Sequence, residues 1–144
     1  MADKYDCLRL GNQLCFPLYA CSKEIVHRYK PMLDELDLTY TQYITMMVMW
    51  EHKSLNVKEL GEYVYLDSGT LTPLLKKLEA KGYVKRTRCA NDERCVNVEV
   101  TPEGLQLEEK ALSVPGQMWC TLGLTPKEAE TLKLLLTKVL DNKN

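Results

Sequence analysis

Apolar residues recur every three or four positions along much of this chain, which is the spacing that one face of an α-helix requires. The first stripe consists of Leu14, Leu18, Ile25 and Val26. It predicts a long helix that either ends near Pro31 or continues with a kink to Leu36, because proline interrupts helical hydrogen bonding. The last stripe consists of Leu132, Leu135, Leu136, Val139 and Leu140. It predicts a terminal helix whose apolar face serves either the core or a dimer interface.

Helix starts are marked by residues whose side chains accept a hydrogen bond from the first turn. Thr39 opens a capping box, in which a glutamine three residues later returns the hydrogen bond. Asn56, Thr101 and Thr125 occupy the same position before three further helical runs. These four residues predict four helices after the first one. Leu71 to Leu78 predict one more.

The pattern changes between residues 54 and 101, where helical spacing gives way to alternation. Two short amphipathic runs, 57–64 and 67–81, precede two β-prone runs, 83–88 and 95–100. This order is typical of a winged helix-turn-helix, in which one helix enters the DNA major groove. We therefore expect a mainly α fold with a small β hairpin.

Pro73 affects where the second helix of this unit should begin. Because proline is tolerated in the first turn of a helix, we expect the helix to start near Thr70 and to end before Gly82. Its apolar positions predict a core-facing side made of Leu71, Leu74, Leu75 and Leu78.

The chain has 144 residues, of which 45% are hydrophobic and 27% charged. This composition is that of an ordinary globular protein, and we interpret residues 1–144 as one domain. The longest apolar run, from Ile44 to Trp50 and interrupted by Thr45, is far shorter than the ~20 residues that span a bilayer. No apolar signal core follows the N-terminus, so we expect a cytoplasmic protein with no membrane partner.

Charge is uneven along a chain whose net charge is only −1. Bases gather between Lys76 and Arg88, where Glu79 is the one acid. Inside a helix-turn-helix pattern this basic stretch predicts contact with double-stranded DNA. The candidate DNA-binding residues are Asp67, Ser68, Thr70, Thr72, Lys76, Lys77, Arg86, Arg88, Asp92 and Arg94.

Six cysteines are present, and without an export signal we expect them to begin as thiols. Their spacing includes no Cys-x-x-Cys, and His27 and His52 lie far apart in sequence. We therefore expect neither a metal site nor a cofactor. Cys89 and Cys95 flank the hairpin turn, and we expect two reduced thiols there rather than a disulfide.

Several blocks of the sequence together resemble one family. They are Asn12–Phe16, Tyr29–Pro31, Leu38–Tyr40, Trp50–His52, Leu66–Pro73, Asp92–Arg94 and Val114–Gly116. Through these blocks the chain resembles the MarR family of bacterial transcription regulators. The closer resemblance is to the organic-hydroperoxide-sensing branch of that family, the OhrR-type repressors. The Leu-Asp-Ser-Gly-Thr-Leu-Thr-Pro block is the most specific of them.

The resemblance implies a homodimer built from residues 1–36 and 113–144, which carries the DNA-binding unit 54–101 onto an inverted-repeat operator. It also implies that Arg94 enters the minor groove with Asp92 orienting it. Oxidation by an organic hydroperoxide or another oxidant would release the operator.

The resemblance implies that Cys15 is the thiol that reacts with peroxide, with Tyr29 and Tyr40 as its hydrogen-bonding partners across the dimer. A peroxide is attacked by the thiolate, which a helix N-terminus stabilises. If Pro17 delays the start of the first helix, Cys15 lies at that N-terminus; if the helix bends instead, its geometry differs from that of the family. Tyr19, one turn beyond Cys15, is a further candidate neighbour.

The sulfenic acid formed on Cys15 would condense with another thiol. Cys21 lies ~9 Å further along the helix, which is beyond disulfide reach. Cys120 lies where two-cysteine members of the family carry a resolving cysteine, so an intersubunit Cys15–Cys120 bond is one outcome. A mixed disulfide with a low-molecular-weight thiol is the other.

Three other functions compete with this interpretation. A MarR-type regulator could bind a small aromatic or lipophilic ligand, with Cys15 incidental. A thiol peroxidase or reductase is disfavoured by the lack of an adjacent histidine base. A DNA-bending protein would show no response to oxidants.

Overall fold

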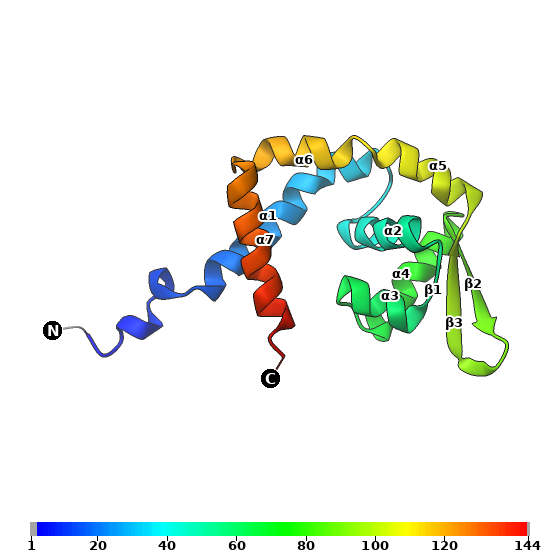
Figure 1. Cartoon of the computed structure of the whole chain (residues 1–144), viewed down its shortest axis with the longest axis horizontal. Coiled ribbons are helices and arrows are strands. Elements are labelled where there is room, and N and C mark those ends of the chain that lie inside the picture. Colours follow the sequence, from blue (N-terminus) through cyan, green and yellow to red (C-terminus); the bar gives the residue numbers. More distant parts are fainter. Residues whose placement is uncertain (1–2, 144) are drawn as a thin grey trace. The chain divides into compact units, whose positions relative to one another are not determined.

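The computed structural model describes residues 3–143, which divide into two compact units at Val114 (Figure 1). The first unit contains two 3-10 turns, five helices and three strands among its described residues. They are η1 (Asp6–Leu8), η2 (Leu10–Asn12), α1 (Cys15–Asp34), α2 (Tyr40–His52), β1 (Ser54–Asn56), α3 (Val57–Val64), α4 (Ser68–Ala80), β2 (Val84–Cys89), β3 (Asp92–Val100) and α5 (Pro102–Ala111). Helix α6 (Val114–Leu122) begins at the boundary, and α7 (Pro126–Asp141) lies in the second unit.

Each predicted N-cap is confirmed by a hydrogen bond. Gln42 N–H donates to Thr39 Oγ1 at 3.3 Å while Gln42 Oε1 accepts from Thr39 N–H at 3.0 Å. Thr125 makes the same reciprocal pair with the N–H and carboxylate three residues on, and Asn56 and Thr101 each cap their helix. The four polar side chains therefore satisfy backbone donors that have no partner inside their own helix.

The prolines are accommodated differently from what we expected in one case. Helix α1 begins at Cys15, so Pro17 lies in its first turn, and the helix continues past Pro31 to Asp34. Helix α4 begins at Ser68, two residues before the predicted start, because Asp67 Oδ1 accepts the Thr70 N–H at 2.8 Å. Pro73 consequently lies inside the helix, and our expectation of a first-turn proline was wrong.

The sheet has three antiparallel strands in the order β1-β3-β2. The predicted hairpin of β2 and β3 is present, and Figure 1 shows it extending past α3 and α4. Strand β1, which the sequence prediction missed, adds to the other edge of β3, with Leu55 opposite Val98. The observed fold is mainly α with a small sheet, as predicted.

The core lies between α2, α3, α4 and the sheet. Its fully buried side chains include Met46, Met49, Leu60, Leu71, Leu75, Leu78 and Val98. The predicted apolar side of α4 is buried, which leaves the opposite side of this helix for polar residues. Every buried side-chain nitrogen or oxygen of the described residues has a hydrogen-bond partner.

Helix α5 contacts the base of the hairpin through its own backbone at Gly104. The Trp50 indole N–H donates to the Gly104 carbonyl at 2.8 Å, and Gly104 N–H donates to Thr101 Oγ1 at 3.0 Å. A Cβ at this position would lie 2.3 Å from the Tyr83 carbonyl oxygen and 2.7 Å from a Val100 methyl group. Only glycine fits this contact without displacing backbone.

We predict that Gly104→Ala lowers the free energy of unfolding by about 1–3 kcal/mol, the range for overpacking a close contact. Gly116→Ala is the matched control, because Gly116 lies in helix α6 and a Cβ there would have no neighbouring atom within 4 Å. Urea unfolding followed by circular dichroism would measure both variants. Equal midpoints for the two would contradict the packing argument.

Candidate DNA interface and redox site

A tight turn joins α3 to α4, and the three elements together form the helix-turn-helix. Leu66 N–H donates to the Gly61 carbonyl at 3.1 Å, and Tyr65 has a left-handed backbone with a φ of 57°. A Cβ on Gly61 would lie 2.6 Å from the Leu66 carbonyl oxygen. The chain reverses closely here, so α4 begins directly after the turn.

Asp67 caps α4 rather than extending outward as a free carboxylate. The Thr70 backbone N–H, followed by the Thr70 hydroxyl, holds the pKa of the Asp67 carboxyl below its ordinary value. A capping role explains why an acid occurs among the candidate DNA-binding residues. Asp67 keeps the first turn of α4 ordered.

The solvent side of α4 carries the predicted polar residues. Ser68, Thr70, Lys76 and Lys77 are exposed, and Thr72 is half-buried. Because Leu71, Leu74, Leu75 and Leu78 are buried, the polar side faces away from the core. Helix α4 therefore presents hydroxyls near its N-terminus and ammonium groups further along.

Arg86 is held by an internal ion pair with Glu79, which joins α4 to β2. The Glu79 carboxylate accepts from Arg86 Nη2 at 3.1 Å, Nε at 3.3 Å and the backbone N–H at 2.8 Å. The backbone N–H, ahead of the guanidinium, holds the pKa of Glu79 below its ordinary value. The sequence did not predict this ion pair, because its two residues are seven positions apart and lie on different elements. A DNA contact by Arg86 stays a prediction.

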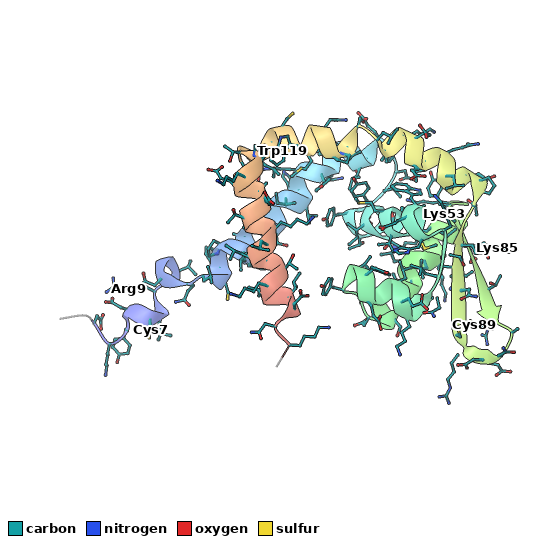
Figure 2. The ribbon with its side chains drawn as sticks, viewed as in Figure 1. Cys7, Arg9, Lys53, Lys85, Cys89 and Trp119 are labelled. Atoms are coloured by element: carbon teal, nitrogen blue, oxygen red, sulfur yellow. A yellow bond between two sulfur atoms is a disulfide. The ribbon has the colours of Figure 1, made fainter. Side chains whose placement is uncertain are left out.

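The hairpin tip carries two exposed arginines, Arg88 and Arg94. Asp92 Oδ1 accepts the backbone N–H of Arg94 at 2.9 Å. Asp92 thus orders the backbone that carries Arg94, instead of pairing with its guanidinium. Figure 2 shows Cys89 near this tip and Lys85 nearer the base of the hairpin.

A disulfide joins Cys89 and Cys95 across the hairpin, with Cα atoms 5.3 Å apart. Our expectation of two reduced thiols at these positions was wrong. The two cysteines directly adjoin the last regular pair of the ladder. From Val84–Val100 to Arg88–Val96 the ladder advances one residue on each strand, and the register shifts at Cys89, which pairs with Asp92.

Cys15 is the first residue of α1 and is exposed in the chain taken alone. Pro17 is the third residue of the helix and lies in its first turn, so Cys15 lies at the helix N-terminus, as in the first of the two alternatives. A helix N-terminus carries a partial positive charge that favours anions. Tyr19, one turn on, is 61% exposed, and the Lys23 ammonium lies 5.3 Å from its ring centroid.

Tyr29 and Tyr40 pack together with a third ring, that of Tyr43. The Tyr29 centroid lies 5.0 Å from that of Tyr40 and 5.7 Å from that of Tyr43. Burial, and then the neighbouring phenols, raises the pKa of Tyr29 to about 12. Burial also raises the pKa of Tyr40 and Tyr43.

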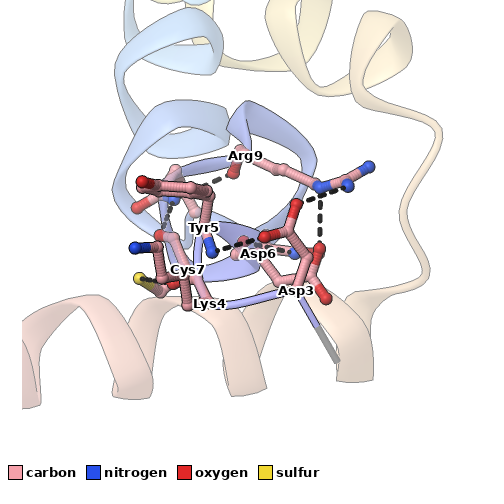
Figure 3. Close-up of polar contacts among 8 residues, drawn as sticks. Asp3, Lys4, Tyr5, Asp6, Cys7 and Arg9 are labelled. Atoms are coloured by element: carbon pink, nitrogen blue, oxygen red, sulfur yellow. Dashed lines mark hydrogen bonds and ion pairs between the residues drawn. The ribbon is translucent and has the colours of Figure 1, made fainter. Parts of the chain in front are cut away.

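The Cys15 thiol and the tyrosine cluster lie far apart within one chain. Fourteen residues of α1 separate Cys15 from Tyr29, which corresponds to about 21 Å along the helix axis. The other exposed thiols, Cys7, Cys21 and Cys120, belong to η1, α1 and α6 respectively. Figure 3 shows Cys7 beside the N-terminal ion pairs of Arg9 with Asp3 and Asp6.

A cavity of about 570 Å³ opens between α1 and the start of α2. It is lined by Ser22, Lys23, Val26, His27, Lys30, Leu33, Asp34, Leu38, Thr39 and Tyr40. Within residues 3–143, no three metal-ligating side chains converge, and no helix is long and apolar enough to cross a membrane.

The model of the transcriptional regulator SarA/Rot family matches residues 27–110, more than half of the chain. The organic hydroperoxide resistance transcriptional regulator of Bacillus subtilis is 49% identical over 94% of this chain and 90% of its own length. The chain belongs to the MarR/SarA family of transcription regulators. The family prediction made from the sequence is confirmed.

Other MarR/SarA members agree in sequence and structure. The regulator SarZ of Staphylococcus saprophyticus is 47% identical over 86% of this chain and 85% of its own length. The solved structure of reduced AbfR bound to DNA matches with a TM-score of 0.79 and 32% identity, covering 95% of this chain and 94% of that one. This MarR/SarA protein is therefore a DNA-binding regulator, not a thiol peroxidase or reductase.

We predict that the free energy of unfolding falls as the pH rises from 10 to 12. The unfolded chain loses the Tyr29 proton near its ordinary pKa of 10.0, whereas the folded protein keeps it until about 12. The stabilisation is thus complete below pH 10 and is lost as the pH passes through the folded pKa. Urea unfolding at several alkaline pH values would measure the fall.

Tyr29→Phe should make that fall shallower because it removes one of the buried phenols. Tyr65→Phe, which removes an exposed phenol, is the control. An unchanged slope in Tyr29→Phe would show that the cluster does not carry the alkaline sensitivity.

Proposed function

We propose that this protein is a homodimeric repressor that binds an inverted-repeat operator and releases it when an organic hydroperoxide oxidises Cys15. The observation that carries the proposal is an exposed thiol at the first residue of α1, in a chain 49% identical to an organic hydroperoxide resistance regulator. The thiol is open to solvent, so a hydroperoxide can reach it.

DNA binding would use α4 in the major groove and the β2–β3 hairpin beside it. The polar side of α4 supplies Ser68, Thr70 and Thr72 near its N-terminus and Lys76 and Lys77 toward its end. Arg88 and Arg94 are exposed at the hairpin tip, where an arginine fits the negative potential of a minor groove. Phosphate contacts by the lysines would add salt-dependent affinity.

Homodimer formation is supported by the apolar surface of α1 and α7, each considered by itself. The structure describes every residue of α1 and α7. In the isolated chain, Leu33 is the one buried residue of α1, and α7 has none. Apolar side chains are exposed at Leu14 directly before α1, at Phe16, Leu18 and Val26 on α1, and at Leu132, Leu134, Leu135, Leu136, Val139 and Leu140 on α7. Contiguous apolar surface of this kind marks protein–protein interfaces.

A dimer would also bring the Cys15 thiol of one copy close to the Tyr29 and Tyr40 hydroxyls of the other. Because about 21 Å of helix separates Cys15 from Tyr29 in one chain, we expect the Tyr29 and Tyr40 hydroxyls to serve the Cys15 of the second copy. Neutral phenols suit this role, since a protonated hydroxyl donates a hydrogen bond to a thiolate. The Tyr29 phenol, whose pKa is raised from 10.0 to about 12, is protonated near neutral pH.

The oxidation step consumes one hydroperoxide. The Cys15 thiolate attacks the terminal oxygen of the hydroperoxide, the O–O bond breaks and the alkoxide leaves. The alkoxide takes up the proton that the thiol lost, so the products are a cysteine sulfenic acid and an alcohol. A second thiol then displaces water from the sulfenic sulfur and forms a disulfide. We expect that thiol to be Cys120 of a second copy or a low-molecular-weight thiol.

Ligand sensing is not proposed as the main function. The cavity beside α1 offers room for a small aromatic molecule, but the relative at 49% identity is a hydroperoxide resistance regulator. We expect a cytoplasmic location, because a bacterial repressor acts where the chromosome lies.

We predict that Arg94→Ala weakens operator binding by about 1–3 kcal/mol, the range for a groove-reading arginine. Glu93→Gln is the matched control at the neighbouring tip position and should bind as tightly as the wild type or more tightly. Fluorescence anisotropy on a duplex enriched from a random pool by the reduced protein would measure both. Equal affinity of Arg94→Ala and wild type would exclude Arg94 from the interface.

We predict that Cys15→Ser binds the same duplex but no longer releases it when cumene hydroperoxide is added. Cys21→Ser, which removes another exposed thiol of α1, should release it like the wild type. The same anisotropy titration with and without the oxidant measures the response. Release by the Cys15→Ser protein would show that the sensor lies elsewhere.

A further inference from the structure

The hairpin tip is a closed loop built on a break in the strand register. The ladder runs regularly from Val84–Val100 to Arg88–Val96, and then Cys89 pairs with Asp92. In this register, Glu93, Arg94 and Cys95 have no partner on β2 within the described hairpin. The exposed Arg94 is thus the middle residue of a three-residue bulge in β3.

Two links close the bulge. Asp92 accepts the Arg94 backbone N–H within the tip, and the Cys89–Cys95 bond ties the base of the bulge to the end of β2. The Cα separation of 5.3 Å lies inside the usual disulfide range of roughly 4.4–6.8 Å. Each cysteine adjoins a residue of the last regular pair, Arg88 and Val96, so the ladder would keep the two thiols close together when the bond is reduced.

We propose that Cys89 and Cys95 form a second redox site, distinct from Cys15. Oxidation of the Cys89–Cys95 pair by an organic hydroperoxide strengthens the binding of the hairpin to DNA. The proposal rests on the proposed function, since it takes the hairpin to be a DNA-binding wing. The argument is one of preorganisation. A loop that is already closed loses less conformational freedom when Arg94 enters a groove.

The chemistry balances with the oxidant already named. One cysteine thiolate attacks the terminal oxygen of the hydroperoxide, and the O–O bond breaks to give a sulfenic acid and an alcohol. The other thiol then attacks the sulfenic sulfur, and water leaves as the disulfide forms. Two thiols and one hydroperoxide therefore give one disulfide, one alcohol and one water. In a reducing cytosol the pair returns to thiols when the oxidant is removed.

This site would act against Cys15. Oxidation of Cys15 releases the operator, whereas oxidation of the wing pair tightens it. The wild-type response to oxidant is then the sum of two opposed effects. Removing Cys15 would expose the effect of the wing.

The test uses the full-length Cys15→Ser protein, so that release through Cys15 is absent. Its affinity for the enriched duplex is measured by anisotropy after treatment with a thiol reductant and after treatment with cumene hydroperoxide. Peptide mapping after alkylation records whether Cys89 and Cys95 are linked. We expect the oxidised, linked protein to bind about three- to tenfold more tightly than the reduced protein, the effect of ordering one long side chain in advance.

The matched control is Cys15→Ser combined with Cys95→Ser, which should bind equally well in both conditions. Cys15→Ser combined with Cys89→Ser repeats the control from the other strand. The proposal fails if hydroperoxide does not link the two cysteines, or if the linked protein binds no more tightly than the reduced one. The proposed function is tested separately with Cys95→Ser alone, which keeps Cys15 and should still release the duplex on oxidation.

Discussion

The backbone contact at Gly104 is the constraint on which the geometry of the DNA-binding unit depends. Because this residue has no side chain, α5 can approach the Tyr83 carbonyl at the base of β2 and also accept the Trp50 indole N–H. Thr101, which caps α5, in addition donates its hydroxyl to the Gly82 carbonyl. One short segment thereby joins α2, the end of α4 and the hairpin base. The direction of the hairpin relative to α4 follows from this junction.

Local signals made much of the fold predictable. Thr39 and Thr125 each identified a helix start because a cap depends on residues three apart, and the apolar side of α4 followed from spacing alone. Strand β1 escaped prediction because three residues carry too little periodicity, and its pairing depends on β3, more than forty positions away. The start of α4 was misplaced because a general rule about Pro73 was given more weight than the cap that Asp67 provides.

The candidate site was predictable to the extent that single residues carry its chemistry. Cys15 and Arg94 were chosen because the chain resembles a family of regulators, and their roles stay predictions, whereas the partners around them depend on three-dimensional contacts. Tyr43 joins the cluster of Tyr29 and Tyr40 only because α1 packs on α2. The Cys89–Cys95 bond illustrates the same limit, since compartment suggested thiols while strand register brought the two sulfur atoms together.

The ion pair between Glu79 and Arg86 has a consequence for how the regulator leaves DNA. Three hydrogen bonds attach the last turns of α4 to the start of β2. The helix and the hairpin should therefore move as one rigid unit. A signal that tilts α4 must carry the hairpin tip with it. The helix and the hairpin would therefore leave the DNA together, and intermediate states with only one of them bound would be sparsely populated.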